Sequence, residues 1–288
     1  MNLKMRRRGV IGAFLGAPLL MGAGRSSSST SGSTSGSPSG SPSGGKIPRG
    51  YAGVDPRTAR RVPLWQPLSP ANPIFPDDPR FTYRIVSTVK EDGYLLEQIT
   101  SLGTHTGTHI SAPAHFHEGA PYLDQLDESW TLMPLVVLDV RRRVARDGGD
   151  FSLGVKDLQA FERRHGRIPH GGGVLLLTGF GRLFFKRKGP GRADDYFDPA
   201  PGLSGDAVTW LFDRRHIRAT GSDAFGPDAS SDEDFSATSI TLAKGGITIE
   251  NVGPGLEQMR PFGDWVSVNG PRARFSGFQM GITGFTKP

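Results

Sequence analysis

The chain has 288 residues, of which 36% are hydrophobic and 22% charged, and it contains no cysteine. Without cysteine there is no disulfide framework, no thiolate metal site and no cysteine nucleophile. The formal net charge of +6 arises in the first 50 residues, which hold seven basic residues and no acid, so the remaining chain, at −1, lacks the basic footprint of a nucleic-acid-binding protein.

The first 24 residues have the layout of a secretory signal: a basic start, a short apolar run and small residues at the end. Arg7 and Arg8 directly precede the apolar run, which resembles a twin-arginine signal, so we expect export to the cell envelope or beyond. The run is too short for a comfortable membrane span, and an N-terminal anchor is the alternative. Residues 25–46 are rich in Ser, Gly and Pro and predict a flexible linker before a catalytic domain over residues 47–288.

The globular part begins with a proline-rich stretch, residues 65–78, which predicts an ordered loop rather than a helix or a central strand. It holds the aromatic residues Trp65 and Phe75. Residues 82–89 and 94–100 are then rich in β-branched and aromatic residues and predict two strands.

The most informative stretch is residues 105–117, which hold four of the seven histidines of the chain. This density indicates metal or proton chemistry, with a histidine-rich loop that binds no metal as the alternative. The side chains of interest lie an even number of residues apart, at His105, His109, Ser111 and His115. On extended backbone they would leave the same face. A straight strand would hold the first two histidines about 13 Å apart, and Gly107 gives the backbone the freedom to bend so that both can reach one ion.

Strands and helices alternate in the following part of the chain. Apolar runs at residues 135–140 and 173–178 predict strands, and helical spacing at residues 155–164 predicts a helix between them. Residues 203–212 predict a second helix with Ser204 as its N-cap, and a strand follows at residues 217–223. This alternation indicates an α/β architecture.

A second element of the site is the alternating strand predicted over residues 247–250, which ends in Glu250. A carboxylate at a strand end is the expected third ligand beside two histidines in a hydrolytic metal site. The acidic loop between these strands lacks the Gly and Glu register of an EF-hand, and its carboxylates are expected to be solvated. Its Asp223 and Asp228 are the candidates for an additional metal ligand, and His117 is another.

The histidine segment resembles the signature of the cyclase and kynurenine formamidase family, His-x-Gly-Thr-His-x-Asp-x-Pro-x-His-Phe, with Ser111 in place of the aspartate. The pair Glu250 and Asn251 is similar to the Glu-Asn-Leu element of that family. The resemblance implies an α/β fold of the swivelling β/β/α type, with mixed sheets and flanking helices. It also implies arylformamidase-like hydrolysis of a C–N bond in a small-molecule substrate, and it allows a homo-oligomer.

The resemblance assigns His105, His109 and Glu250 to a metal ion. Family members of the formamidase type hold two ions, and two ligands of the second ion are replaced here, an aspartate by Ser111 and a histidine by Thr238. Hydroxyl groups are weak ligands beside carboxylate and imidazole. We therefore predict one divalent ion, zinc or, as the alternative, manganese, with water in the open position and with Ser111 hydrogen-bonded to that water or to a ligand.

The resemblance also assigns proton transfer to His115. In the predicted mechanism the ion lowers the pKa of its bound water toward about 7, the hydroxide attacks an amide, formamide or lactam carbonyl, and His115 passes a proton to the leaving amine. The resemblance puts Phe75 at the position of an aromatic residue that lines the substrate pocket, and packing within the proline-rich loop is the alternative. Phe75 and Trp65 are expected to bind an aromatic or cyclic substrate. The alternative is a metal-binding or small-ligand-binding protein on the same fold that has lost hydrolysis together with the missing aspartate.

Overall fold

The computed structural model describes residues 50–51, 53–55, 57–75, 77–184 and 199–288. The described residues belong to one compact unit. The expected signal segment and linker, residues 1–24 and 25–46, lie outside the described ranges. Within those ranges, no helix is long and apolar enough to cross a bilayer.

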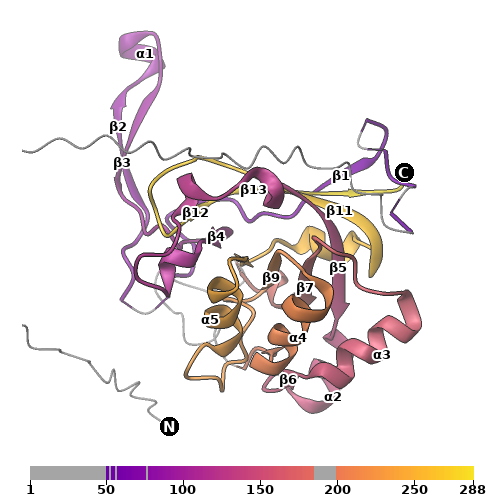
Figure 1. Cartoon of the computed structure of the whole chain (residues 1–288). Coiled ribbons are helices and arrows are strands. Elements are labelled where there is room, and N and C mark those ends of the chain that lie inside the picture. The colour runs from indigo at the N-terminus through magenta and orange to yellow at the C-terminus, as the bar shows by residue number, and fades with distance from the viewer. Residues whose placement is uncertain (1–49, 52, 56, 76, 185–198) are drawn as a thin grey trace, which may run out of the picture. The chain divides into compact units, whose positions relative to one another are not determined.

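A nine-stranded mixed sheet organises the molecule (Figure 1). Its strands, in spatial order, are β1 (Arg60–Pro63), β13 (Gly281–Thr286), β11 (Phe262–Asn269), β5 (Leu132–Asp139), β7 (Gly173–Leu177), β9 (Ala219–Ser222), β10 (Ile247–Glu250), β4 (His109–Ser111) and β12 (Gly277–Gln279). Neighbours from β5 to β10 are parallel, and the remaining pairs are antiparallel. Strands β5 and β7 are almost continuously apolar because both of their faces are buried.

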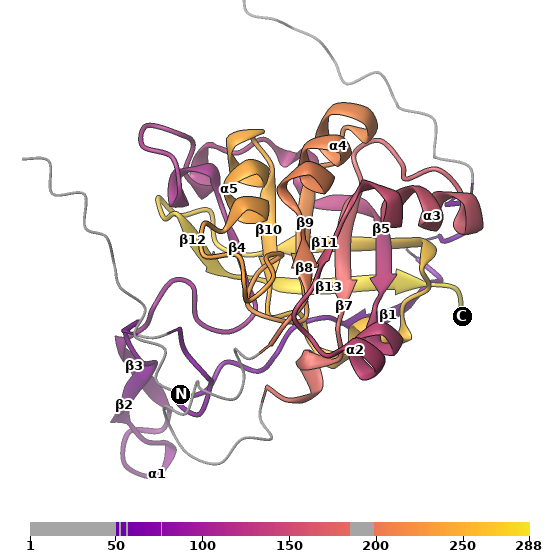
Figure 2. The same ribbon diagram turned by 90° about the horizontal axis from the view of Figure 1, so that it is seen from below.

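Helices cover one face of the sheet, and the curled sheet encloses a second core on the other (Figure 2). The helices are α2 (Arg141–Asp147), α3 (Val155–His165), α4 (Gly205–Arg215) and α5 (Ser236–Ala243). Alternate residues of β5 divide between the two cores, because side chains alternate along a strand. Val136 and Leu138 pack in the core beneath the helices, whereas Leu135 and Val137 belong to the core inside the curled sheet.

A separate hairpin stands away from this body, as Figures 1 and 2 both show. It consists of β2 (Thr82–Ser87) and β3 (Leu96–Ser101), with the short helix α1 (Val89–Asp92) at its tip. The remaining elements are the pair β6 (Ser152–Leu153) and β8 (Gly202–Leu203) and the 3-10 helices η1 (Pro113–His115), η2 (Leu123–Gln125), η3 (Glu128–Trp130), η4 (Phe180–Arg182) and η5 (Pro254–Gln258).

The predicted α/β fold of mixed sheets with flanking helices is confirmed. The predicted helices are α3 and α4, and the hydroxyl of Ser204 accepts a hydrogen bond from the amide of Ala207 at 3.2 Å, as expected of an N-cap. The predicted strands are β5, β7, β9 and β10, and the two strands expected before the histidine segment form the hairpin.

Two local features differ from the predictions. The extended face expected along the histidine segment is limited to His109–Ser111, because His105 lies in a turn and His115 ends η1. Helix α5 is not predicted, since its β-branched residues favour strands. Asp228 stabilises its first turn, and its Oδ1 accepts hydrogen bonds from the amides of Ala237 at 2.7 Å and Thr238 at 3.0 Å.

Candidate active site

The candidate site lies on three antiparallel strands, β10, β4 and β12. Two rows of directly paired residues cross these strands, namely Glu250–His109–Gln279 and Thr248–Ser111–Gly277. Directly paired residues point to the same face of a sheet, so the side chains of Glu250, His109 and Ser111 gather on one side. Strands β9 and β10 run parallel and end here, at the edge where open α/β sheets bind ligands.

A turn brings the histidine segment to the strand that carries the carboxylate. Gly107 adopts φ 69°, and a β-carbon there would lie 2.9 Å from Asn72 Nδ2, so glycine is required. Asn251 Nδ2 donates to the Gly107 carbonyl at 3.2 Å, and the Thr108 hydroxyl donates to the Asn251 carbonyl at 2.6 Å. Because Asn251 directly follows Glu250, these two bonds hold the turn against β10.

His109 presents a free nitrogen to Glu250. Its Nδ1 lies 2.8 Å from the Gly107 carbonyl, which can only accept, so Nδ1 carries the proton. Its Nε2 is buried, has no hydrogen-bond partner among the described residues and lies 3.5 Å from Glu250 Oε2. An imidazole lone pair facing a carboxylate is unfavourable unless a proton or a cation joins them. This orphaned nitrogen therefore fits the metal ion that the sequence predicts.

Three hydroxyl groups orient the other ligand candidates. Thr248 and Ser111 donate to Glu250 Oε1 at 2.6 Å and 3.2 Å. The Ser111 hydroxyl also lies 3.2 Å from His105 Nδ1, and the Ser276 hydroxyl lies 3.2 Å from His105 Nε2. Ser111 thus bridges His105 and Glu250, in the position where the resemblance expects an aspartate.

The position of the His105 ring depends on Gly277 of β12. A β-carbon at Gly277 would lie 2.3 Å from His105 Cε1, so only glycine leaves room for the imidazole. Burial, together with smaller contributions from repulsion by His109 and His115, lowers the pKa of His105 to about 2. His105 is therefore neutral, as a metal-binding histidine must be.

His115 lies at the exposed side of this cluster. Its ring stacks on the His105 ring, with centroids 3.9 Å apart and an interplanar angle of 21°. Desolvation of the imidazole by the surrounding protein lowers the pKa of His115. The carboxylate of Glu250 opposes this shift, and His109 adds to it. A neutral imidazole at the mouth of the site can accept a proton from a reacting group.

Four phenylalanines form a series of ring contacts that begins at His115. The His115 ring lies 5.0 Å from Phe116, and Phe235 lies 6.2 Å from Phe116 and 6.5 Å from Phe75. Phe225 lies 6.4 Å from Phe75. These centroid distances and the steep angles between the rings are those of edge-to-face packing. The sequence predicts Phe75 as part of this wall but not the other three.

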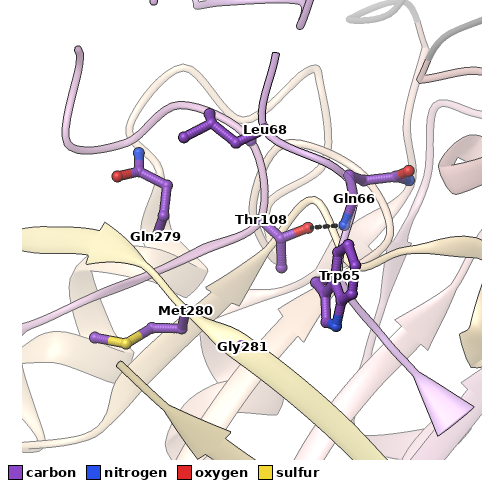
Figure 3. A pocket seen from close by; sticks show the side chains of 8 residues that line it. Trp65, Gln66, Leu68, Thr108, Gln279, Met280 and Gly281 are labelled. Carbon is purple, nitrogen blue, oxygen red and sulfur yellow. Dashed lines mark hydrogen bonds between the residues drawn. The ribbon is translucent and has the colours of Figure 1, made fainter. Parts of the chain in front are cut away.

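Trp65 occupies a different place. It lines a hollow of about 260 Å³, shown in Figure 3. The lining, as far as the described residues show, consists of Trp65, Gln66, Leu68, Gly107, Thr108, Gln279, Met280 and Gly281. The four phenylalanines are not among these residues. Trp65 therefore adjoins the histidine turn without joining the aromatic wall.

The three candidates for an additional metal ligand are hydrogen-bonded to other groups. Asp223 accepts hydrogen bonds from the amide and hydroxyl of Thr178 and from two glycine amides, and His117 Nε2 lies 2.9 Å from the Ser239 carbonyl. Asp228 holds α5 but is close to the site. A β-carbon on Gly226 would lie 3.6 Å from both Asp228 Oδ2 and Glu250 Oε2.

Burial of Asp228 raises the pKa of its carboxyl group to about 6. The hydroxyl and amide of Thr238 oppose this shift, and the charge of Glu250 adds to it. The Thr238 hydroxyl donates to Asp228 Oδ2 at 2.5 Å. The residue that stands in place of the second-ion histidine is therefore bonded to this carboxylate.

In this site His109 Nε2 faces the Glu250 carboxylate, and the Ser111 hydroxyl links His105 to Glu250. Among the described residues, no three histidine or acidic side chains already surround a point as metal ligands. Serine hydroxyls lie within hydrogen-bond distance of both nitrogens of His105. The roles of Ser111, Ser276 and Gly277 depend on pairing between strands distant in sequence, and only Ser111 is recognisable from the sequence.

Comparison with known proteins identifies the family. Residues 61–229 match the family model described as "Putative cyclase". The chain belongs to this cyclase family. Kynurenine formamidase of Bacillus cereus is 27% identical over 197 residues, which are 68% of this chain and 83% of the relative. Kynurenine formamidase of Bacillus anthracis is 28% identical over 182 residues, which are 63% and 76%.

Solved structures share the fold of this cyclase family member. Isatin hydrolase A from Ralstonia solanacearum superposes with a TM-score of 0.70 at 24% identity, covering 81% of this chain and 94% of the other. Isatin hydrolase A from Labrenzia aggregata bound to benzyl benzoate gives 0.71 at 24% identity, covering 82% and 97%. The predicted cyclase-like fold is thus confirmed, and the named relatives are hydrolases.

Proposed function

We propose that this chain hydrolyses a C–N bond in a small amide, formamide or lactam, and that His105, His109 and Glu250 hold one divalent ion. The observation that carries the proposal is the opposition of His109 Nε2 and Glu250 Oε2, two acceptor atoms 3.5 Å apart. The relatives named kynurenine formamidase and the structures named isatin hydrolase support hydrolysis.

The ligand set suits zinc, with manganese as the alternative. Two histidines and one glutamate with an open position are a recognised catalytic zinc arrangement. When bound, such an ion polarises a carbonyl and lowers the pKa of water. Gly107 fixes the tautomer of His109, and Thr248 orients Glu250, so both ligands are positioned by their neighbours.

His115 is the proposed carrier of the proton. Its ring is exposed at the mouth of the site and rests on His105. During hydrolysis a bond forms from the water oxygen to the carbonyl carbon, the C–N bond breaks, and His115 carries a proton from the water to the leaving nitrogen. The lowered pKa of His115 keeps the imidazole ready to accept that proton at neutral pH.

The phenylalanine wall favours an aromatic or cyclic substrate. The ring of Phe116, beside His115, and the ring of Phe235, beside Phe116, are partly exposed, and Phe75 continues the wall. A planar ring can pack against these side chains while its amide group reaches the histidines. The substrates in the names of the relatives, kynurenine and isatin derivatives, support this choice.

A second candidate is a binding protein that has lost hydrolysis. It is favoured by Ser111 and Thr238, because each donates to a carboxylate, Glu250 or Asp228, in an internal hydrogen bond. Those bonds leave the two carboxylates less available for a second ion.

Metal titration of the purified full chain distinguishes the two candidates. The protein would be loaded stepwise with zinc or manganese and assayed with formanilides and cyclic imides. The hydrolase predicts turnover proportional to bound metal. Thermal stabilisation by members of this panel without turnover of any of them would contradict the hydrolase and support the binding protein.

A further inference from the structure

A second hollow lies at the opposite edge of the sheet from the candidate active site. Its volume is about 360 Å³, and its lining comes from the loop around η3, the end of α4 and the turns that precede β9 and β10. Ile247 begins β10 at this hollow, whereas Glu250 ends the same strand in the candidate active site. As far as the described residues show, none of the proposed metal ligands lines the second hollow.

Trp130 lines the second hollow and has an unsatisfied hydrogen-bond donor. Its side chain packs in the core inside the curled sheet and is only 5% exposed. The indole Nε1 is buried, carries a hydrogen and has no partner among the described residues. Because buried polar groups in folded proteins almost always have a partner, this N–H calls for an acceptor.

Arg218 brings a guanidinium with unused donors to the same hollow. Its Nη1 donates to the Ser129 hydroxyl and lies 3.9 Å from Asp127 Oδ1. Within the described ranges the side chain has no other polar contact, so Nε and Nη2 keep their hydrogens for an acceptor. A guanidinium binds a carboxylate through two parallel N–H groups.

The acids beside the second hollow oppose an anion only weakly. Asp213 is paired with Lys244, whose Nζ lies 2.7 Å from Asp213 Oδ1. The Asp127 side chain is 77% exposed, so water and salt screen its charge. Arg218 is therefore the charge that decides which ligand the hollow accepts.

We propose that the second hollow binds a small carboxylate that carries an aromatic ring. The carboxylate accepts hydrogen bonds from Arg218 and Trp130, and the ring packs on the apolar side chains of Phe212, Ile217 and Ile247. The volume falls within the roughly 300–1,000 Å³ of small-molecule sites, which combine apolar walls with a few polar groups in the same way. Binding of this ligand does not require hydrolysis at the metal site.

Isothermal titration calorimetry of the purified full chain with sodium benzoate tests the proposal. Benzoate is expected to bind saturably. Benzamide, which keeps the ring but has no charge, and acetate, which keeps the charge but has no ring, should each bind more weakly. Arg218→Gln should weaken benzoate binding roughly 10-fold or more, and Trp130→Phe, which keeps a ring but removes the N–H, roughly 2- to 10-fold.

Two further comparisons separate this hollow from other places where benzoate could bind. His109→Ala alters the proposed metal site and should bind benzoate as the wild type does. Lys244→Glu changes an exposed residue at the rim and should weaken binding even if Arg218→Gln or Trp130→Phe misfolds. Lys156→Glu, the same charge change at an exposed position of α3, is the matched control and should bind as the wild type does.

Several results would overturn the proposal. They are the absence of saturable benzoate binding, equal affinity for benzamide or acetate, and unchanged affinity in a folded Arg218→Gln variant. Equal affinities of Lys244→Glu and Lys156→Glu would also overturn it. Loss of benzoate binding in His109→Ala would assign the ligand to the metal site instead.

Discussion

At the residue scale, the candidate site is organised by which atom carries each hydrogen. The Ser111 hydroxyl has one hydrogen and donates it to Glu250, so it must accept from His105 Nδ1. His109 uses its Nδ1 hydrogen on the Gly107 carbonyl and leaves Nε2 without a hydrogen-bond partner among the described residues. This nitrogen and the Glu250 carboxylate, 3.5 Å apart, therefore remain available to a cation.

The assignment of His115 to proton transfer is tested by His115→Ala. Turnover should fall by roughly 10² to 10⁴-fold, because the general base and acid is lost. The metal content should not change, since His115 is not among the proposed ligands. His117→Ala is the control, because its ring is bonded to the Ser239 carbonyl, and it should retain turnover. Loss of metal from His115→Ala would make this histidine a ligand.

The space above Gly277 is tested by Gly277→Ala. The added β-carbon would overlap the His105 ring, so the ring must move, and a displacement of about 1 Å can cost on the order of 10²-fold in rate. The metal affinity of purified protein should fall in parallel. Gly281→Ala is the matched control, because its β-carbon would meet only the Asn269 carbonyl, at 3.4 Å. Equal activity in the two variants would contradict the placement of His105.

At the element scale, apolar runs and helical spacing in the sequence are sufficient to predict the strands and helices of what the structure shows to be the parallel part of the sheet, because buried strands leave apolar runs in the sequence. The even spacing of the histidine segment predicted the shared face of His109 and Ser111 and failed beyond them, since β4 ends after three residues. His105 reaches the site through the turn at Gly107. The contribution of Gly277 could not be predicted, because β12 pairs with β4 across more than 160 residues of chain.

Helix α5 was missed for a related reason: the carboxylate of Asp228, outside the helix, holds its first turn. The folded chain binds the proton of Asp228 more tightly than the unfolded chain, whose aspartate pKa is about 3.9. Stability should therefore decrease as the pH rises from about 4 to about 6, by up to about 3 kcal/mol from this group. Urea unfolding of metal-free Asp228→Asn, which keeps the accepting oxygen, should show a smaller decrease than the wild type. Equal pH dependence of the two proteins would contradict the raised pKa.

At the scale of the whole molecule, the candidate site belongs to the described body, whereas the expected export signal lies outside the described ranges. We propose that the basic and apolar segment at the N-terminus directs export by the twin-arginine route, which carries folded proteins. Arg7→Lys together with Arg8→Lys should leave the protein inside the cell, as measured by fractionation. Export that is unchanged in this variant would exclude the route.

The central claim is that His105, His109 and Glu250 share one cation. Elemental analysis of the full chain, purified without chelators, tests it most directly. The account predicts about one equivalent of a divalent metal in the wild type, a large loss in His109→Ala and in Glu250→Gln, and no loss in His170→Ala, whose ring lies at the surface. Two equivalents in the wild type, none at all, or full retention in Glu250→Gln would contradict it.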